Sequence, residues 1–493
     1  MMNYVSTRDR EGALKIRSAE AIKKGLAPDG GLFMPERIPA LTEEEIHALS
    51  EMKYEERAPF ILGKFLDDYD PETLAGYARE AYSEERFPGG AAPLREVEKG
   101  IFSLELWHGP TCAFKDMALQ IMPRLLSGAL KMTGERRVAH ILVATSGDTG
   151  KAALEGFRDV DGVRITVFYP EDGVSAMQKL QMTTQEGNNV SVCAVKGNFD
   201  DAQTGVKRIF SDPEAAARAE DGNSFFSSAN SINWGRLAPQ IVYYASAYCD
   251  LLKTGAIKYG DPVNVTVPTG NFGNIFAGYI ARKMGVPIKR FVCASNSNRV
   301  LTDFIETGVY DRNREFFRTA SPSMDILISS NLERLLYVLG GAEATAGFMA
   351  DLSAAGRYEV PEKLLEEVRS VFSGYSSDEA ETFQTIKDLF DRNGYLCDPH
   401  SAVAFGCARR YIEESGDATP MVVVSTANPY KFPADVLRAL GEEPRGDTPD
   451  ALFGALSART GTTPPKPLLR TATLPVRFTD SVEPAGMDAF VFR

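Results

Sequence analysis

From about residue 100 onward, short apolar runs of strand length alternate with amphipathic runs of helical length. In 101–106 alternate apolar residues share one face, as in a strand, whereas apolar residues from Phe114 to Ala129 recur at helical spacing. Further strand-like runs are 138–145, 163–169, 190–195, 263–267, 288–294 and 421–425, with helical runs at 151–157 and 274–284. This alternation predicts an α/β protein with parallel sheets covered by helices.

The two ends of the chain have a different pattern. Residues 1–95 are rich in charge and are expected to be helical, with a helix start at Thr42. Residues 441–475 contain several Pro, Thr and Gly residues and are expected to form a surface excursion. The sequence has no internal repeat.

A chain of 493 residues exceeds the usual size of one hydrophobic core, so two or three domains are expected. The 54 basic and 67 acidic residues give a formal charge of −13, which argues against general binding to nucleic acid or anionic membranes. The six cysteines form no C-x-x-C pair, so neither a zinc site nor a dense disulfide framework is indicated. We expect a cytoplasmic protein, since no run resembles a signal peptide or a membrane span.

Histidines and isolated aspartates suggest little chemistry by themselves. The four histidines are His47, His108, His140 and His400, and their spacing indicates neither a metal cluster nor a Ser-His-Asp arrangement. His140 lies inside a strand-like run and is expected in the core. Asp116, Asp200 and Asp201 are expected to be cap or surface carboxylates.

Lys115 lies where the strand-like run 101–106 has ended and a helical run begins. Ligands of open α/β sheets gather at the carboxyl ends of strands, and a lysine partly desolvated there has a lowered pKa and is a better Schiff-base nucleophile. The alternative is a solvated helix lysine, which position alone favours.

Two glycine-containing loops also lie between a strand and a helix. Residues 270–274 can offer backbone N–H groups and a helix N-terminus to a phosphate, although a tight turn is about equally compatible with them. Residues 145–151 fail the spacing of a nucleotide P-loop, because two residues instead of four separate the glycines and Ala152 follows the lysine. Their hydroxyls and backbone donors suit a carboxylate ligand.

Polar residues near 230 and at 426 are ambiguous from the residues alone. Asn230, Ser231 and Arg236 can clasp a phosphate ester, but a helix capped near Asn233 with Arg236 on its surface is the simpler interpretation. Thr426 ends the strand-like run 421–425, where its hydroxyl could bind a ligand or simply end a strand.

Seven motifs in one order resemble those of a known family. The four central ones are HGPTCAFKD (108–116), ATSGDTG (144–150), SANSIN (228–233) and VPTGNFGN (267–274), and the outlying ones are GLAPDGGLF (25–33), DPHSAVA (398–404) and TANP (426–429). Together they span nearly the whole chain. The chain therefore resembles the threonine synthase family, which consists of pyridoxal-phosphate enzymes of the tryptophan-synthase-β type (fold type II).

The resemblance implies a role for each residue of these motifs. Lys115 would carry pyridoxal 5′-phosphate as a Schiff base, and Thr426 would meet its pyridine nitrogen. The remaining implied contacts are Gly270, Asn271, Phe272, Gly273 and Asn274 with the cofactor phosphate, Thr145 and Ser146 with the substrate carboxylate, and Thr149, Asn230, Ser231 and Arg236 with the substrate phosphate. Asp148 stands beside the expected pyridine hydroxyl, where an acid must be protonated or turned away. His108 and His400 are expected to shape the pocket, and Asn428 stands where relatives carry His.

The implied activity is conversion of O-phospho-L-homoserine and water to L-threonine and phosphate, with the oligomeric state left open. The implied domains are an N-terminal one (1–95), a large one (96–134 and 236–493) and a small α/β one (135–235), with the cofactor between the last two. Alternatives are a related phospho-lyase releasing 2-oxobutyrate, a serine/threonine dehydratase, a non-catalytic relative and a P-loop protein. The residues of the phosphate clasp argue against a dehydratase, Lys115 against a non-catalytic relative, and the failed spacing against a P-loop.

Overall fold

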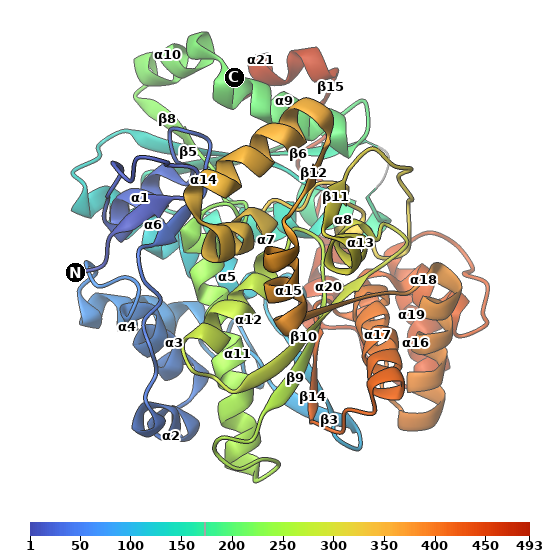
Figure 1. Ribbon diagram of the computed structural model, residues 1–493. Coiled ribbons are helices and arrows are strands. Elements are labelled where there is room, and N and C mark those ends of the chain that lie inside the picture. The colour runs from blue at the N-terminus through green and yellow to red at the C-terminus, as the bar shows by residue number, and fades with distance from the viewer. Residues whose placement is uncertain (172–173) are drawn as a thin grey trace.

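The structure, a computed structural model, describes residues 1–171 and 174–493 and contains two main sheets, one above the other in Figure 1. The large sheet has the strand order β13-β10-β9-β14-β4-β3. Its strands are β3 (Leu94–Glu98), β4 (Ile101–Glu105), β9 (Val263–Pro268), β10 (Ile288–Ser295), β13 (Phe372–Ser376) and β14 (Met421–Ser425). Neighbouring strands run parallel except β3, which is antiparallel to β4.

Both faces of the large sheet are buried, which explains the continuous apolar runs of its strands. In β14, Val422 and Val424 belong to one apolar cluster, whereas Met421 and Val423 belong to another. Helices α11 (Trp234–Thr254) and α12 (Gly273–Lys283) contribute to the first cluster and α17 (Pro399–Ser415) to the second. Other elements around this sheet are α5 (Asp116–Leu119), α6 (Met122–Met132), α13 (Val300–Thr307), β11 (Val309–Asp311), η1 (Pro322–Met324), α14 (Leu332–Ala355), β12 (Arg357–Glu359), α15 (Glu362–Val371) and α16 (Glu379–Asn393).

The small sheet has five parallel strands in the order β15-β7-β6-β5-β8. Four of them come from one stretch, namely β5 (Val138–Ala144), β6 (Val163–Pro170), β7 (Val190–Val195) and β8 (Ser224–Ser227). The helices of that stretch are α7 (Asp148–Phe157), α8 (Ala176–Thr183), α9 (Phe199–Ser211) and α10 (Pro213–Asp221). Each sheet therefore arises from strand-helix alternation, as the apolar pattern predicts.

The N-terminal segment packs against the large sheet's helices. It contains β1 (Tyr4–Ser6), α1 (Ser18–Lys24), β2 (Phe33–Pro35), α2 (Glu43–Glu51), α3 (Tyr54–Gly63) and α4 (Pro71–Ala81), with β1 and β2 antiparallel. The predicted helix start at Thr42 is confirmed, because the Thr42 side chain accepts from the Glu45 N–H and completes a capping box. Helices α2 and α3 both contact α11, which joins this segment to the core.

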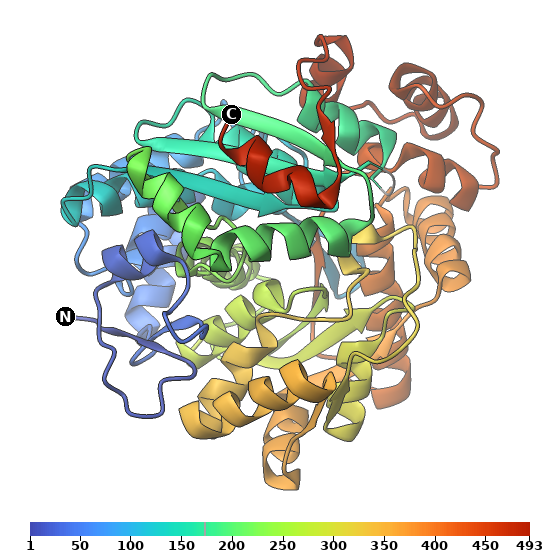
Figure 2. The ribbon, with the colours of Figure 1, turned by 90° about the horizontal axis from the view of Figure 1, so that it is seen from above.

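The C-terminal region corrects two predictions. Residues 441–475 are more than a surface excursion, because α19 (Pro449–Thr460) and α20 (Lys466–Thr473) bury Leu452, Phe453 and Leu468. The assignment of the whole of 236–493 to the large domain is wrong for residues 481–493, because β15 (Ser481–Val482) pairs with β7 and α21 (Met487–Val491) packs on α9. Figure 2 shows this red segment lying against the small sheet. The remaining elements are η2 (Pro429–Lys431), α18 (Pro433–Ala439) and η3 (Pro484–Gly486).

The predicted strands of the central region are confirmed, whereas the helical run that begins at Phe114 is divided into α5 and α6. Strands β7 and β14 have the predicted bounds, β4, β5, β6, β9 and β10 differ from them by one residue at one end, and α12 is shifted by one residue at both ends. Among the described residues, no helix is long and apolar enough to cross a membrane, and no group of His, Cys, Asp and Glu side chains could hold a metal ion. All six cysteines are buried and unpaired.

Gly156 lets helix α7 pack directly on α5. A β-carbon at this position would collide with the backbone carbonyl oxygen of Leu119, the last residue of α5. Since α5 begins just after Lys115 and α7 begins at Asp148, this close approach brings the two motifs together.

We predict that Gly156→Ala lowers the free energy of unfolding by about 2 kcal/mol, because a backbone carbonyl cannot move aside as a side chain can. Gly454→Ala in α19 is the matched control, since no described atom lies within 4 Å of its added β-carbon. That variant is expected to gain about 0.5–1 kcal/mol from helix propensity. Urea unfolding checks both variants, and equal effects would contradict the close packing.

Candidate active site between the two sheets

A cavity of about 490 Å³ lies between elements of the two sheets. Its walls include all fourteen residues to which the sequence assigned a role, namely Lys115, Thr145, Ser146, Asp148, Thr149, Asn230, Ser231, Arg236, Gly270, Asn271, Phe272, Gly273, Asn274 and Thr426. They come from the segments after β4, β5, β8, β9 and β14. Because parallel strands of one sheet end at the same edge, strand-end motifs far apart in sequence meet there.

Lys115 is held at the cavity by the backbone on its N-terminal side. The N–H of Phe114 donates to the carbonyl of Thr426 at 2.8 Å, and Ala113 forms an isolated bridge with Ala427. The Lys115 Nζ lies 3.1 Å from Ser323 Oγ and 3.6 Å from Asp148 Oδ2. Burial lowers the pKa of Lys115, so its amine is more often uncharged than an exposed lysine.

Of the two alternatives for Asp148, a protonated acid or one turned away, its surroundings favour an ionised carboxylate. Burial acts to raise the pKa of Asp148, but the ammonium groups of Lys431 and Lys115 outweigh it and hold that pKa below its ordinary value. Lys431 Nζ lies 2.7 Å from Asp148 Oδ1, and Gln178 Nε2 donates to the same oxygen at 2.9 Å. This pairing turns Oδ1 toward Lys431 and Gln178, while Oδ2 remains on the side of Lys115.

Lys431 was missed in the sequence. It lies two residues beyond the motif 426–429, and its side chain is fully buried. The sequence feature that could have indicated its burial is its position between two aromatic residues, Tyr430 and Phe432, which are themselves buried. Only the fold shows that Asp148, the first residue of α7, lies next to it.

The loop 270–274 leaves a helix N-terminus facing the cavity. Phe272 adopts a left-handed conformation, with φ of 59°, immediately before α12. No side chain of the described residues caps this helix, so its first backbone N–H groups are available to a ligand. At Gly270 a β-carbon would lie 2.6 Å from the carbonyl oxygen of Ser323, so glycine is needed for the approach of that segment.

Two buried donors lack partners at this end of the cavity. The hydroxyls of Tyr243 and Tyr244 each lie 2.6 Å from Asn274 Oδ1, which leaves Asn274 Nδ2 without a partner among the described residues. Arg236 is 4% exposed, and its Nε also lacks a hydrogen-bond partner in residues 1–171 and 174–493. Burial lowers the pKa of Arg236 to about 10, which still leaves a cation at neutral pH. These groups suit an anionic ligand.

Asn230 and Ser231 precede the buried start of α11. Asn331 Nδ2 donates to Ser231 Oγ at 2.9 Å, and Arg334 Nη1 donates to the Ser231 carbonyl at 3.1 Å. The expected helix cap near Asn233 is confirmed, because the Asn233 side chain accepts a hydrogen bond from the Gly235 N–H at the start of α11. Arg236, however, is buried at the cavity and is not a surface residue.

In the loop 145–151, Thr145 shapes the backbone. Its Oγ1 accepts hydrogen bonds of 2.9 Å from the N–H groups of Gly147 and Gly150. Gly147 has φ of 138°, and a β-carbon there would collide with the side chain of Gln178, so glycine is required. Ser146 and Thr149 are left at the cavity wall.

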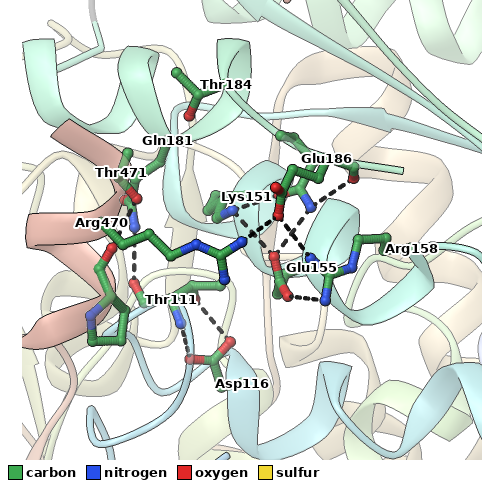
Figure 3. A network of polar contacts seen from close by, with 12 residues as sticks. Thr111, Asp116, Lys151, Glu155, Arg158, Gln181, Thr184, Glu186, Arg470 and Thr471 are labelled. Atoms are coloured by element: carbon green, nitrogen blue, oxygen red, sulfur yellow. Dashed lines mark hydrogen bonds and ion pairs between the residues drawn. The ribbon is translucent and has the colours of Figure 1, made fainter. Parts of the chain in front are cut away.

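Lys151 belongs to a separate polar network and does not line the cavity (Figure 3). Its Nζ lies 3.3 Å from Glu155 Oε2 and also contacts Gln185 Oε1. Through Glu186 the network reaches Arg158 and Arg470, so it ties α7 to α20. The lysine of a P-loop would point to a phosphate, and the rejection of that motif is consistent with this geometry.

Asp398 supports two walls of the site through its neighbours. Its Oδ2 lies 2.6 Å from His400 Nδ1, and His400 Nε2 accepts from the Ser323 N–H at 3.1 Å. Ser401 Oγ also bonds to Asp398 and accepts from the Thr426 N–H at 3.2 Å. His400 thus joins Asp398 to the backbone of Ser323, and it positions that backbone segment.

The other histidines and Asp116 have structural surroundings. His108 lies 2.8 Å from Glu105 and does not line the cavity, so the expectation that it shapes the pocket is not met. His140 is in the core, as predicted. Asp116 is fully buried and accepts from Thr111, and burial raises its pKa to about 6. It is therefore neither a helix cap nor a surface residue, and its carboxylate instead holds the loop before α5 through Thr111. Asp201 lies in the capping box of α9, and the Asp200 side chain is outside the described residues.

Family models cover most of the chain. "Threonine synthase N terminus" matches residues 3–82, "Pyridoxal-phosphate dependent enzyme" matches 89–427 and "Threonine synthase, C-terminal" matches 401–464. The fold and the lysine-containing cavity thus define a pyridoxal-phosphate-dependent enzyme of fold type II.

Individual relatives narrow this class. Threonine synthase of Pseudomonas aeruginosa is 40% identical over 458 residues, covering 90% of this chain and 92% of that protein. A crystal structure of PLP-bound threonine synthase from Brucella melitensis has a TM-score of 0.87 and 38% identity, and the match covers 100% of this chain and 99% of that one. Threonine synthase-like 1 of Pongo abelii is 40% identical over 89% of this chain, which spans 60% of that longer protein. The chain belongs to the threonine synthase family.

We predict that Lys115 is the attachment point of the cofactor. Its position and its lowered pKa favour an uncharged, nucleophilic amine. Borohydride reduction of the cofactor-loaded protein and peptide mass mapping should place a pyridoxyl group on Lys115. Lys151, which is equally buried but pairs with Glu155 and does not line the cavity, is the internal control. An adduct on any lysine other than Lys115 contradicts the assignment.

Proposed function

We propose that this protein is a threonine synthase, which converts O-phospho-L-homoserine and water to L-threonine and phosphate. The observation that carries the proposal is that Lys115 and Arg236 line the same cavity. A nucleophilic amine suits the cofactor, and a buried guanidinium whose Nε has no partner among the described residues suits a phosphorylated substrate. The named relatives support the same assignment.

The residues present fit pyridoxal 5′-phosphate. Lys115 would hold it covalently, the α12 N-terminus with Gly270 to Asn274 would bind its phosphate, and the free Asn274 Nδ2 supplies a further donor. Thr426 would meet the pyridine nitrogen with a neutral hydroxyl. When bound, the cofactor withdraws electrons from the substrate and so makes its α and β protons removable.

The protein's own groups would direct this chemistry. The Lys115 amine would carry protons at the substrate Cα and Cβ, and Asp148 Oδ2 would orient that amine. Arg236, with Thr149, Asn230 and Ser231, would hold the γ-phosphate as it leaves, while Thr145 and Ser146 would fix the carboxylate end.

We also propose a cytoplasmic location and a division into three parts. These parts are residues 1–95, residues 96–134 with 236–480, and residues 135–235 with 481–493. The strand pairing supports the placement of the last segment. The formal charge of −13 supports the absence of general nucleic-acid binding.

Product analysis tests the proposed reaction against its alternatives. With O-phospho-L-homoserine, the purified protein should release phosphate and L-threonine in equal amounts. Release of 2-oxobutyrate in place of threonine would instead identify a phospho-lyase, and faster turnover of serine than of the phosphate ester would identify a dehydratase.

We predict that Arg236→Ala lowers kcat/KM for O-phospho-L-homoserine by about ten- to more than a hundredfold, because a charge-assisted hydrogen bond contributes roughly 1.5–3 kcal/mol. The cofactor colour should persist. Arg164→Ala, which removes an exposed arginine on β6, is the control and should match the parent. Equal losses with serine and with the phosphate ester would show that Arg236 supports the fold or the cofactor.

A further inference from the structure

Lys431 takes no part in the reaction steps above, yet its side chain is fully buried beside the cavity. Its Nζ lies 2.7 Å from Asp148 Oδ1 and donates a 3.0 Å hydrogen bond to the carbonyl oxygen of Thr111. A buried ammonium group is unfavourable unless it is paired and hydrogen-bonded.

The two oxygens of Asp148 have different surroundings. Oδ1 accepts from Lys431 and from Gln178 Nε2, at 2.7 and 2.9 Å. The Gln178 Oε1 accepts from the Ser175 N–H at 3.2 Å, which fixes the amide so that Nε2 faces Asp148. Oδ2 is left toward Lys115, whose Nζ lies 3.6 Å away. The carboxylate is therefore anchored by one oxygen and presents the other.

The turn that carries Lys431 is itself fixed. Asn428 Oδ1 accepts from the Tyr430 N–H at 3.0 Å and so caps η2. The Asn428 N–H donates to the Cys112 carbonyl at 3.1 Å. Asn428, which stands where His was expected, thus shapes the turn between Thr426 and Lys431.

We infer that Lys431 is a positioning residue, which anchors Asp148 by Oδ1 so that Oδ2 is presented to the Lys115 amine. Because Lys431 is also a cation, it offsets the negative charge that Lys115 meets. An amine beside an uncompensated carboxylate would hold its proton more tightly and be a weaker nucleophile.

The charged groups that act on Lys115 come from three elements. Burial lowers the pKa of Lys115, Asp148 of α7 raises it, and Lys431 of η2 and Arg236 of α11 lower it further. Asp116 also faces Lys431, whose charge acts to lower the carboxyl pKa. Removal of Lys431 therefore raises the pKa of Lys115, so that its amine stays protonated up to a higher pH.

Acetylation of Lys115 in the full chain freed of cofactor tests this inference. Acetic anhydride reacts with the uncharged amine, and peptide mass spectrometry gives the rate for Lys115 relative to the exposed Lys363. In Lys431→Met we expect Lys115 to react about tenfold more slowly at neutral pH, since a nearby like charge shifts such a profile by about one unit. The experiment needs no substrate and is independent of the proposed reaction.

Three further variants separate charge from packing. Lys151→Met removes a lysine that is also buried and paired, but with Glu155, and should leave the Lys115 profile unchanged. Lys431→Gln keeps hydrogen-bonding capacity without charge and should shift the profile as Lys431→Met does, which secures the test if the latter fails to fold. Lys431→Arg should restore the parental profile. Unchanged reactivity in both neutral Lys431 variants, or an equal shift in Lys151→Met, overturns the inference.

Discussion

Buried positive charge is the constraint on which this site depends. Lys115, Lys431 and Arg236 are each at most 8% exposed, and Asp148 is the carboxylate that pairs with the first two. Water cannot solvate these groups as it would at the surface, so each needs a partner in the protein or in a ligand. Asp148 meets this need for the lysines, whereas Arg236 is left for an anion. The same charge distribution therefore holds Asp148 between two lysines and leaves a cation at the cavity wall.

The backbone around the cavity is held in place by strand ends and by the carboxylate of Asp398. Asp398 bonds to His400 and Ser401, which in turn hold the backbone of Ser323 and Thr426. The cavity wall on this side is therefore fixed by hydrogen bonds to main-chain N–H groups, which tolerate little displacement. Side chains on such a wall keep their mutual distances, as an active site requires.

The sequence predicts what is local and misses what depends on long-range contacts. β14 is recognisable because a strand buried on both faces is a continuous apolar run, and the Thr42 helix start follows from one capping box. The residues around the cavity are found through strand-end motifs. The sequence does not predict the ion pair between Lys431 and Asp148, because these residues are 283 positions apart and no motif contains both. The sequence does not predict β15, because a strand of two residues is too short to show an alternating pattern. Its pairing depends on the free edge of β7.

Helix α7 links these features, because residues at both of its ends contact other elements. At its first residue, Asp148 meets Lys431 from the large sheet's side, and three residues later Lys151 pairs with Glu155 within a network that extends to α20. Gly156 lets the far end of the helix touch α5, which follows Lys115. These contacts hold the first turn of the helix against the large sheet's side and its last turn against α5. Since Asp148 and Thr149 lie in its first turn, the geometry at Lys115 is set by the packing of the whole helix and not by the loop 145–147 alone.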